Sequence, residues 1–274
     1  MRAVCAKVCG TGDNGNVIEG TELALGAVAG AAAPLSRMSA AKDTHARVFA
    51  LLRQAAPHGH VLDLPAGSGA FTRRLLDADY RATAGDLDAH PALPQEATFA
   101  PCNMDEPLPF ADAGFDAVCS IEGIEHIRRP FDFIRECRRV LAPGAPLLLS
   151  TPNISSLRSR FRHLLTGFHN KGKHPLDETQ PAPRHHINLL SFPALRYMLH
   201  TQGFEIETVA TNQVKAAAWC YAPLVPLAWW ASRSAFRRGI KNPDHARVTH
   251  AVLRQMCSRA VLFGETLIVV ARAR

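Results

Sequence analysis

The sequence predicts an α/β fold in which a doubly wound, mostly parallel sheet carries helices on both faces. Short apolar runs suited to buried strands, at 61–64, 115–120 and 147–151, alternate with segments whose apolar residues recur at helical spacing. A glycine turn joins the first of these strands directly to a helix. An acidic residue follows the second predicted strand, in the place where doubly wound sheets bind nucleosides.

The stretch 61–76 carries the strongest local signal. Asp63 lies near the end of the apolar strand, and Gly67 and Gly69 follow it directly. Glycines at such a turn accept positive φ and let the backbone approach a ligand. Thr72 replaces the third glycine of a dinucleotide site, and no Gly-Lys-Ser/Thr phosphate loop is present. The turn therefore predicts a nucleoside ligand without a pyrophosphate, with an ordinary strand-to-helix turn as the alternative.

Length and composition set only broad limits. A chain of 274 residues with 47% hydrophobic residues is long enough for one substantial core. The formal charge of +7 and the pI near 9.3 allow contact with nucleic acid or an anionic membrane without requiring either. The seven cysteines form no Cys-x-x-Cys pair, so we expect structural thiols in a reducing compartment rather than disulfides.

Residues 1–40 are rich in glycine and alanine and show no periodicity, which predicts a disordered leader. They lack the apolar run and cleavage site of a signal peptide, so export is not expected. Residues 41–274 are predicted to form one domain. Its first helix is expected to be capped by Asp43 and to bury Val48 and Leu52.

The second strand is predicted over 80–84, and a short acidic turn follows it. A carboxylate in this place can accept hydrogen bonds from both hydroxyls of a ribose, which makes Asp86 our candidate for that contact. Asp88 is the second candidate. A solvated turn carboxylate is the structural alternative.

The pattern Asp-x-x-x-Gly-x-Gly after a buried strand resembles the first motif of class I S-adenosylmethionine-dependent methyltransferases. Further similarities in the same order extend the resemblance over 61–209. The resemblance implies a Rossmann-like sheet of seven strands, an antiparallel last strand and S-adenosylmethionine as the cofactor. It implies cofactor contacts for Asp63, Gly67, Gly69 and Asp86. The chain departs from the family at Pro65, where the family usually has glycine, and proline removes a backbone donor.

The segment 102–110 resembles the family stretch that contacts the adenine and continues with Leu-Pro-Phe. Asn103 replaces the acid that the family usually has, and its side-chain oxygen can still accept from the adenine amino group. Met104 is expected to lie on the adenine ring. A plain loop is the alternative for this segment.

Ionisable residues follow the strand 115–120 in Ser-Ile-Glu-Gly-Ile-Glu-His-Ile. Because ligands of open parallel sheets bind at the carboxyl ends of strands, Glu122, Glu125 and His126 should face cofactor or acceptor. Glu-His followed by Pro130 resembles the branch of the family that acts on small molecules. The Asn/Asp-Pro-Pro-aromatic motif of enzymes that methylate nucleic-acid amino groups does not occur here, so nucleic acid is not the expected partner.

The later elements continue the alternation. A helix is predicted from Pro130, and further strands are predicted over 147–151, 204–209 and 265–272. Ser191 is expected to cap the helix that precedes the sixth strand. The last strand should pair antiparallel with the sixth.

A lid is predicted over residues 153–190. Residues 153–168 indicate a helix with one apolar and one basic face. We expect this helix to pack on the core, with an active-site cover or a membrane-surface helix as alternatives. Residues 167–183 lack periodicity, as a mobile lid would. His185 and His186 then suit contact with the acceptor.

The lid contains several histidines, which invite a metal interpretation: His163, His169, His174, His185 and His186. No carboxylate or cysteine partner sits near them at zinc-ligand spacing. Methyl transfer to oxygen can also proceed without a metal, so we expect none.

Residues 214–262 are an insertion between the last two strands, which in the family are usually joined by a short hairpin. Its apolar part, 216–232, contains every tryptophan of the chain, and arginines follow it. Seventeen residues with two prolines are marginal for about 30 Å of hydrocarbon, and a single crossing would leave the last strand on the wrong side of the membrane, so we do not expect this part to span it. Tryptophan beside arginine favours contact with a membrane surface through 153–168 and 216–238, or an apolar wall for a lipid-like acceptor. A dimer interface and internal packing are the alternatives, and the oligomeric state stays open.

These patterns predict a methyltransferase that transfers a methyl group to a small-molecule, lipid-linked or glycan acceptor, on a hydroxyl oxygen. Such an acceptor must lose a proton, and His126 is the candidate base because imidazole titrates near neutral pH. His186 is the alternative base, and Glu122 completes the catalytic candidates.

Leu-Pro-Phe, Glu-His-Ile and His-Ile-Asn-Leu-Leu-Ser resemble bacterial small-molecule methyltransferases of the ubiquinone-pathway or cell-envelope glycan kind. We expect a cytoplasmic protein, or a peripheral one on the inner membrane face. The alternative functions are a non-catalytic membrane-surface scaffold with a degenerate cofactor cradle and an RNA methyltransferase.

Overall fold

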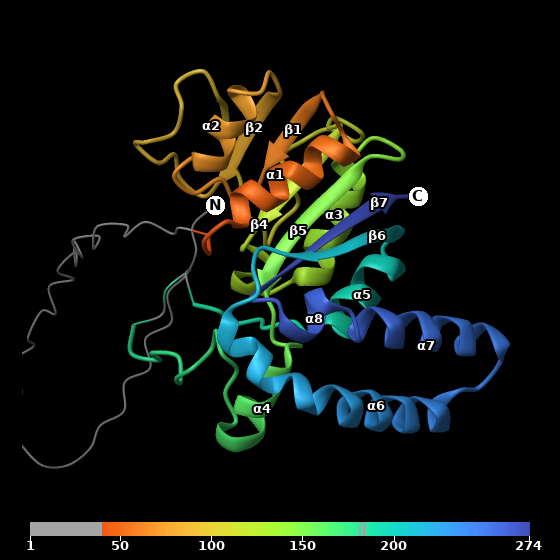
Figure 1. Ribbon diagram of the computed structural model, residues 1–274. Helices are drawn as coiled ribbons and strands as arrows, with labels where there is room; N and C mark the ends of the chain where they lie inside the picture. The colour runs from red at the N-terminus through yellow and green to blue at the C-terminus, as the bar shows by residue number, and fades with distance from the viewer. Residues whose placement is uncertain (1–39, 181, 183–184) are drawn as a thin grey trace, which may run out of the picture. The chain divides into compact units, whose positions relative to one another are not determined.

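A computed structural model describes residues 40–180, 182 and 185–274, which form one seven-stranded sheet with helices around it (Figure 1). The strands are β1 His60–Asp63, β2 Arg81–Asp86, β3 Thr98–Pro101, β4 Ala117–Ile121, β5 Pro146–Pro152, β6 Phe204–Thr211 and β7 Thr266–Ala273. Their order is β3-β2-β1-β4-β5-β7-β6. Strands β1 to β5 pair in parallel, and β7 lies antiparallel between β5 and β6. The predicted doubly wound sheet with an antiparallel last strand is confirmed.

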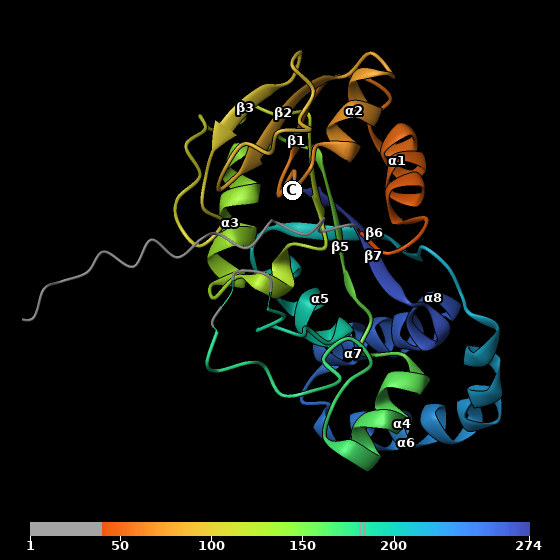
Figure 2. The ribbon, with the colours of Figure 1, turned by 90° about the vertical axis from the view of Figure 1, so that its left-hand side faces the viewer.

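The two faces of the sheet carry different helices because successive side chains of a strand point to opposite sides. On one face, apolar residues of β1, β4, β5 and β7 pack against α1 Thr44–Ala55 and α2 Ala70–Leu76. On the other face they pack against α3 Pro130–Val140 and α5 Phe192–Thr201. Figure 2 shows the sheet between these two layers. These four strands are therefore held in place from both sides.

The N-termini of α5 and α1 test the two predicted helix caps, Ser191 and Asp43. Ser191 caps α5 through a hydrogen bond that its hydroxyl accepts from the Ala194 N–H, as predicted. Asp43 does precede α1, but it does not cap it with its side chain, so that prediction was wrong. Its φ of 63° is left-handed, whereas a capping residue normally has extended φ and ψ from which its side chain reaches the next turn.

Strand β3 is an element that the sequence reasoning missed. It has four residues, of which none is fully buried, and it pairs with β2 alone at the edge of the sheet. A short edge strand lacks the continuous apolar run by which the central strands are recognised. The predicted leader, 1–40, lies outside the described residues except for Ala40.

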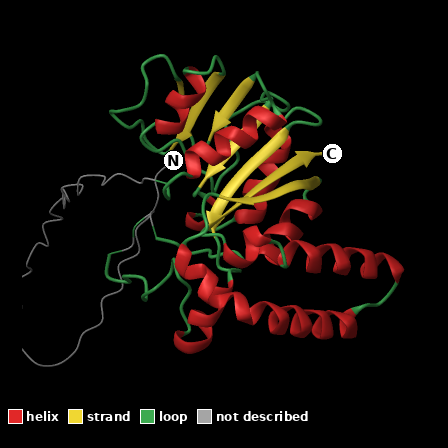
Figure 3. Cartoon of the chain, in the orientation of Figure 1, coloured by secondary structure: helices red, strands yellow, loops and turns green. Residues whose placement is uncertain are grey.

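Helices fill the region beyond the β6 edge of the sheet (Figure 3). They are α4 Leu157–Thr166, the 3-10 helix η2 Ala216–Leu224, α6 Val225–Gly239, α7 Pro243–Met256 and α8 Arg259–Phe263. The expectation that 153–168 packs on the core was wrong for most of its apolar face, because Leu164 and Leu165 are exposed. Among the described residues, no helix is both long and apolar enough to cross a membrane.

Candidate active site

A cleft of about 840 Å³ opens at the carboxyl ends of β1 and β4. The strand order reverses between these two strands, which is where open α/β sheets bind ligands. The loop after β1, the end of β2, the segment 102–106, the loop after β4 and residues 185–187 line it. Every predicted cofactor residue except Gly69 lines this cleft, as do Glu122, His126 and His186.

The glycine loop is tied to the end of β2. The Gly67 N–H donates to Asp86 Oδ2 at 2.8 Å, and the Leu87 N–H donates to Asp86 Oδ1 at 2.7 Å. Each carboxylate oxygen has a second lone pair, so Asp86 retains the capacity to accept from two ribose hydroxyls. Asp88 is exposed and does not line the cleft, so the geometry favours Asp86 for this contact.

Gly67 and Gly69 both have positive φ, of 53° and 76°. A Cβ at Gly69 would lie 2.7 Å from Leu93 Cδ1 and 2.8 Å from Pro94 Cδ. Gly69 is therefore required by the packing of the 93–94 loop as well as by the backbone conformation.

Asp63 lies at the floor of the cleft and is almost completely buried. Its Oδ2 accepts a hydrogen bond of 2.6 Å from the Thr72 hydroxyl on α2. Burial raises the pKa of the Asp63 carboxyl to about 7, against the lowering effect of the Thr72 hydrogen bond. Thr72, which occupies the place of a third glycine, is thus the residue that orients Asp63.

Where the segment 102–106 lines the cleft, Asn103 is half-buried and Met104 is buried. Asn103 Oδ1 accepts from the Asp105 N–H at 3.0 Å, and its amide nitrogen donates to Glu106 at 3.3 Å. The amide is therefore oriented by its own loop, and its oxygen keeps one lone pair for a ligand. Pro65, where the chain departs from the family, packs against Gly123 in the loop after β4.

Glu122 is the first residue after β4, and its φ of 49° is left-handed. Its N–H donates to the Ser150 carbonyl at 3.1 Å, and its Oε1 accepts from the Thr266 hydroxyl at 3.0 Å. A left-handed backbone is uncommon for a residue other than glycine and is often found at functional sites. The contacts to β5 and β7 hold Glu122 in this conformation at the edge of the cleft.

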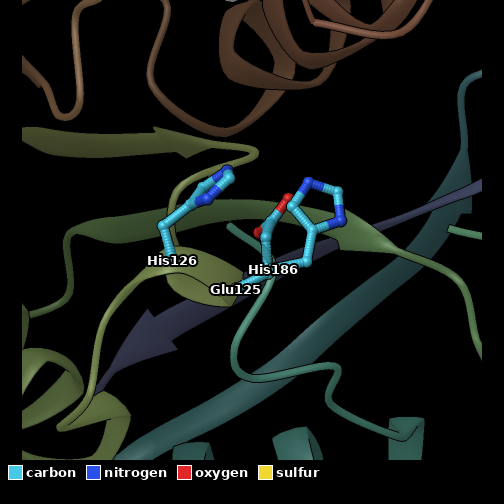
Figure 4. Close-up of side chains that lie close together, drawn as sticks. All are labelled: Glu125, His126 and His186. Carbon is cyan, nitrogen blue, oxygen red and sulfur yellow. The ribbon is translucent and has the colours of Figure 1, made fainter. Parts of the chain in front are cut away.

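His126, His186 and the buried Glu125 come together at the other end of the cleft (Figure 4). The two imidazole rings meet edge to face, with centroids 4.8 Å apart. His126 Nδ1 lies 3.1 Å from the His185 carbonyl oxygen. Because a carbonyl only accepts, Nδ1 must carry the proton in this bond, and Nε2 is then the basic nitrogen of the neutral ring.

Burial controls the charges in this cluster. It raises the pKa of Glu125 to about 8, and the neighbouring Glu122 charge adds to the effect. Glu125 Oε2 accepts from the Thr151 hydroxyl at 3.2 Å, while Oε1 has no hydrogen-bond partner among the described residues. Burial and the Lys171 charge lower the pKa of His186. At neutral pH both Glu125 and His186 are therefore expected to be largely uncharged.

The ligand atoms of Glu125, His126 and His186 all lie within 4.8 Å of one another, close enough to hold a metal ion. Glu125 comes from the loop after β4 and His186 from the segment before α5. Sequence spacing within the lid could not reveal this carboxylate partner. The expectation of a metal-free site stays a prediction.

Sequence reasoning also missed His45, which reaches the cleft from α1 and packs edge-on against Phe71 with centroids 5.6 Å apart. No local pattern around His45 marked it as a site residue, because the approach of α1 to the cleft depends on tertiary packing. Burial, with a smaller effect from Arg74, lowers the pKa of His45.

Residues 35–209, more than half of the chain, match the family described as a methyltransferase domain. The chain belongs to this family. The match confirms the predicted class, the class I methyltransferases that use S-adenosylmethionine.

Curated relatives include the mitochondrial ubiquinone biosynthesis O-methyltransferase of Mus musculus, 26% identical over 64% of this chain and 43% of that protein. The ubiquinone biosynthesis O-methyltransferase of a Caulobacter species is 31% identical over 35% of this chain and 38% of that protein. The matched segments thus span less than half the length of these relatives.

Among solved structures, the 1,6-didemethyltoxoflavin-N1-methyltransferase of Burkholderia thailandensis superposes with a TM-score of 0.50 at 16% identity. The superposition covers 85% of this chain and 79% of that one, which holds S-adenosylhomocysteine and its acceptor. A methyltransferase from Archaeoglobus fulgidus has the same TM-score and identity, with 84% and 94% coverage. These similarities establish the fold and nothing finer.

Proposed function

We propose that this protein binds S-adenosylmethionine in the cleft and transfers its methyl group to a hydroxyl oxygen of a small-molecule, lipid-linked or glycan acceptor. The His126 imidazole removes the hydroxyl proton. The observation that carries the proposal is the hydrogen bond from His126 Nδ1 to the His185 carbonyl, which leaves Nε2 as a base at the mouth of a nucleoside-type cleft.

The lining of the cleft suits this cofactor. Asp86 is held by the glycine loop with lone pairs left for a ribose. Carboxyl groups of Asp63, Asp86 and Glu122 line the same cleft, and carboxylates favour a cationic sulfonium over an anionic pyrophosphate. These residues would hold the cofactor, which supplies the activated methyl group.

The acceptor end supports an oxygen nucleophile. Methyl transfer is an in-line displacement, so much of the rate comes from alignment of acceptor, methyl and sulfur in a site that excludes water. His186 packs edge-on against His126 and restricts its ring. Exposed Ile187 and buried Ile127 give this end of the cleft an apolar border, which suits an acceptor with an apolar part. Two ubiquinone biosynthesis O-methyltransferases among the relatives are in keeping with such an acceptor.

A comparison of wild type with Asp86→Ala and His126→Gln tests the proposal. Calorimetry measures how each protein binds S-adenosylmethionine. A second assay measures the release of S-adenosylhomocysteine in the presence of a panel of phenols and sugar hydroxyls. Loss of two hydrogen bonds from a charged acceptor should weaken cofactor binding by Asp86→Ala by about tenfold or more. His126→Gln should bind the cofactor like wild type and lose about a hundredfold or more in kcat, because its base is gone.

Full turnover by His126→Gln at saturating acceptor would remove His126 from the role of base. If well-folded wild type does not bind the cofactor, the proposed enzymatic function is rejected. The non-catalytic scaffold with a degenerate cofactor cradle is then favoured. Strongly salt-dependent RNA binding by the wild type would favour the RNA methyltransferase instead.

A further inference from the structure

An apolar surface lies outside the cleft, on helices that the methyl-transfer chemistry does not use. Leu164 and Leu165 of α4 are 78% and 68% exposed. On α6, Leu227 is 61% and Trp230 is 64% exposed, and no residue of this fifteen-residue helix is buried. Monomeric soluble proteins rarely leave large apolar side chains together in water, and such patches usually mark an interaction site.

The two helices belong to one surface. Phe161 of α4 contacts Tyr221 of η2, with ring centroids 5.7 Å apart, and η2 continues directly into α6. Leu157 of α4 and Ala228 of α6 both pack into the small core around Leu262 and Phe263 of α8. Figures 1 and 2 show α4 and α6 at the same end of the domain, beyond α8. The small core with α8 thus covers one side of both helices, whereas Leu164, Leu165, Leu227 and Trp230 stay exposed among the described residues.

The charge of this surface has one sign. The sequence contains no aspartate or glutamate from residue 137 to 176 or from 208 to 243, two stretches that include α4, η2 and α6. The first stretch carries arginines on α4, and the second has Arg237 and Arg238 exposed at the end of α6. The Arg233 guanidinium lies 5.3 Å from the ring centroid of Trp229. Apolar and tryptophan side chains bordered by arginines are typical of helices that lie in the interface of an anionic bilayer.

We propose that α4, η2 and α6 form a docking surface for an anionic lipid bilayer. Its apolar contacts are Leu164, Leu165, Trp219, Leu227, Trp229 and Trp230. The apolar side chains enter the boundary between headgroups and acyl chains, and the exposed Arg237 and Arg238 contact anionic headgroups. The helices lie on the bilayer and do not cross it, since none of those described is long enough to span it. The proposal does not depend on the methyl transfer.

A bilayer fits this surface better than a second copy of the chain. A two-fold dimer would bring the same surface of both copies together, and each copy carries arginines without a single acid on α4, η2 or α6. Like charges would then face each other across the interface, which is unfavourable. Anionic headgroups supply the missing negative charge.

The docking surface is close to the cleft along the chain. The segment that follows α4 leads to His185 and His186, which line the acceptor end.

Tryptophan fluorescence tests the proposal directly because all three tryptophans of the chain lie on the docking surface. The full chain is mixed with vesicles of phosphatidylcholine alone, or of phosphatidylcholine with phosphatidylglycerol. We expect a blue shift and co-sedimentation with the anionic vesicles, and both effects should weaken with added salt. Quenching by brominated acyl chains should place the rings below the headgroups.

Leu164→Ser combined with Trp230→Ser should weaken binding to the anionic vesicles by about tenfold or more, because both removed side chains enter the apolar layer. Tyr197→Ser is the matched control, since Tyr197 on α5 is also 64% exposed but lies outside the docking surface. The control variant should bind like wild type. Cofactor titration of all variants should be unchanged, which separates this test from that of the methyl transfer.

Equal binding by the double variant and wild type would overturn the proposal. A concentration-dependent dimer that fails to bind vesicles, and that the double variant dissociates, would assign the surface to a second copy instead. A monomer that ignores anionic vesicles would also reject bilayer docking.

Discussion

At the scale of single residues, the carboxyl of Glu125 is buried behind His126 and His186, which line one end of the cleft. The carboxyl is fully inaccessible to solvent, and its Oε1 has no hydrogen-bond partner among the described residues. A backbone hydrogen bond, the Thr151 hydroxyl and the Lys171 charge favour its ionised form, but the cost of burying the charge outweighs them. The residue therefore keeps its proton at neutral pH and stands as a donor beside His126 and His186.

Glu125 makes stability depend on pH. The carboxyl titrates near 4.5 in the unfolded chain and at about 8 in the folded one. Between these pH values the carboxyl loses its proton in the unfolded state and keeps it in the folded state. A rise in pH therefore stabilises only the unfolded state. The contribution of Glu125 to the free energy of unfolding is fully present below about pH 4.5 and is lost as the pH rises to about 8.

Glu125→Gln should remove this loss and raise the free energy of unfolding above pH 8 by roughly 2–4 kcal/mol, with little change near pH 4. Urea unfolding of both proteins across this range measures the difference. Glu106→Gln is the control, because that carboxyl is exposed. A pH-independent difference between Glu125→Gln and wild type would contradict the buried, protonated carboxyl.

At the scale of elements, the cleft depends on two loops that meet at one point. The loop after β1 contributes Pro65, and the loop after β4 contributes Gly123. A Cβ at Gly123 would lie 2.4 Å from Pro65 Cδ and 3.2 Å from Met104 Cε. Glycine here lets the loop after β1 and the loop after β4 pack directly on each other. Pro65 replaces the usual glycine of the family, and Gly123 provides the space for its ring.

Gly123→Ala should push Pro65 and Met104 aside, weaken S-adenosylmethionine binding by about tenfold and reduce stability by about 1–3 kcal/mol. Calorimetry and thermal unfolding measure the two effects. Adding Pro65→Ala should restore part of both, because the ring atoms nearest the new methyl are gone. Gly239→Ala is the control, since nothing lies within 4 Å of its added methyl. Additive effects of the two cleft substitutions would show that the loops are not coupled.

At the scale of the domain, burial falls steeply from the sheet to the docking surface. Every residue of β4 and β5 is buried, whereas α6 has no buried residue. Local opening of a segment requires only the loss of the contacts that it makes. The sheet and the cleft can therefore stay rigid while α6 opens independently.

Amide hydrogen exchange should show this gradient. In lipid-free protein we expect α6 to exchange at least about a thousandfold faster than β4 and β5, because it opens without disturbing the core. Helix α3, which buries Phe133, Ile134, Cys137 and Val140, is the control and should exchange slowly. Protection of α6 equal to that of α3 in the absence of lipid would indicate that another surface already covers it.

The central strands and one end of the candidate site could be predicted because short, contiguous stretches of sequence specify them. Apolar runs define the central strands, and Asp63, Gly67 and Asp86 lie within contiguous strand-turn segments, so short-range chemistry specifies them. The order of these segments along the chain also places their carboxyl ends at one edge of a parallel sheet. The sequence therefore predicts that these three residues meet at one end of the cleft.

The acceptor end and the docking surface depend on tertiary contacts. Glu125 meets His186 only because the segment before α5 returns to the loop after β4. Periodicity revealed apolar faces on α4 and α6, but a periodic pattern carries no information about what covers such a face. The packing of η2, α7 and α8 against these helices decided that question and left Leu164 and Trp230 in solvent. Contacts between distant segments are set by how the whole chain packs, and no local pattern encodes them.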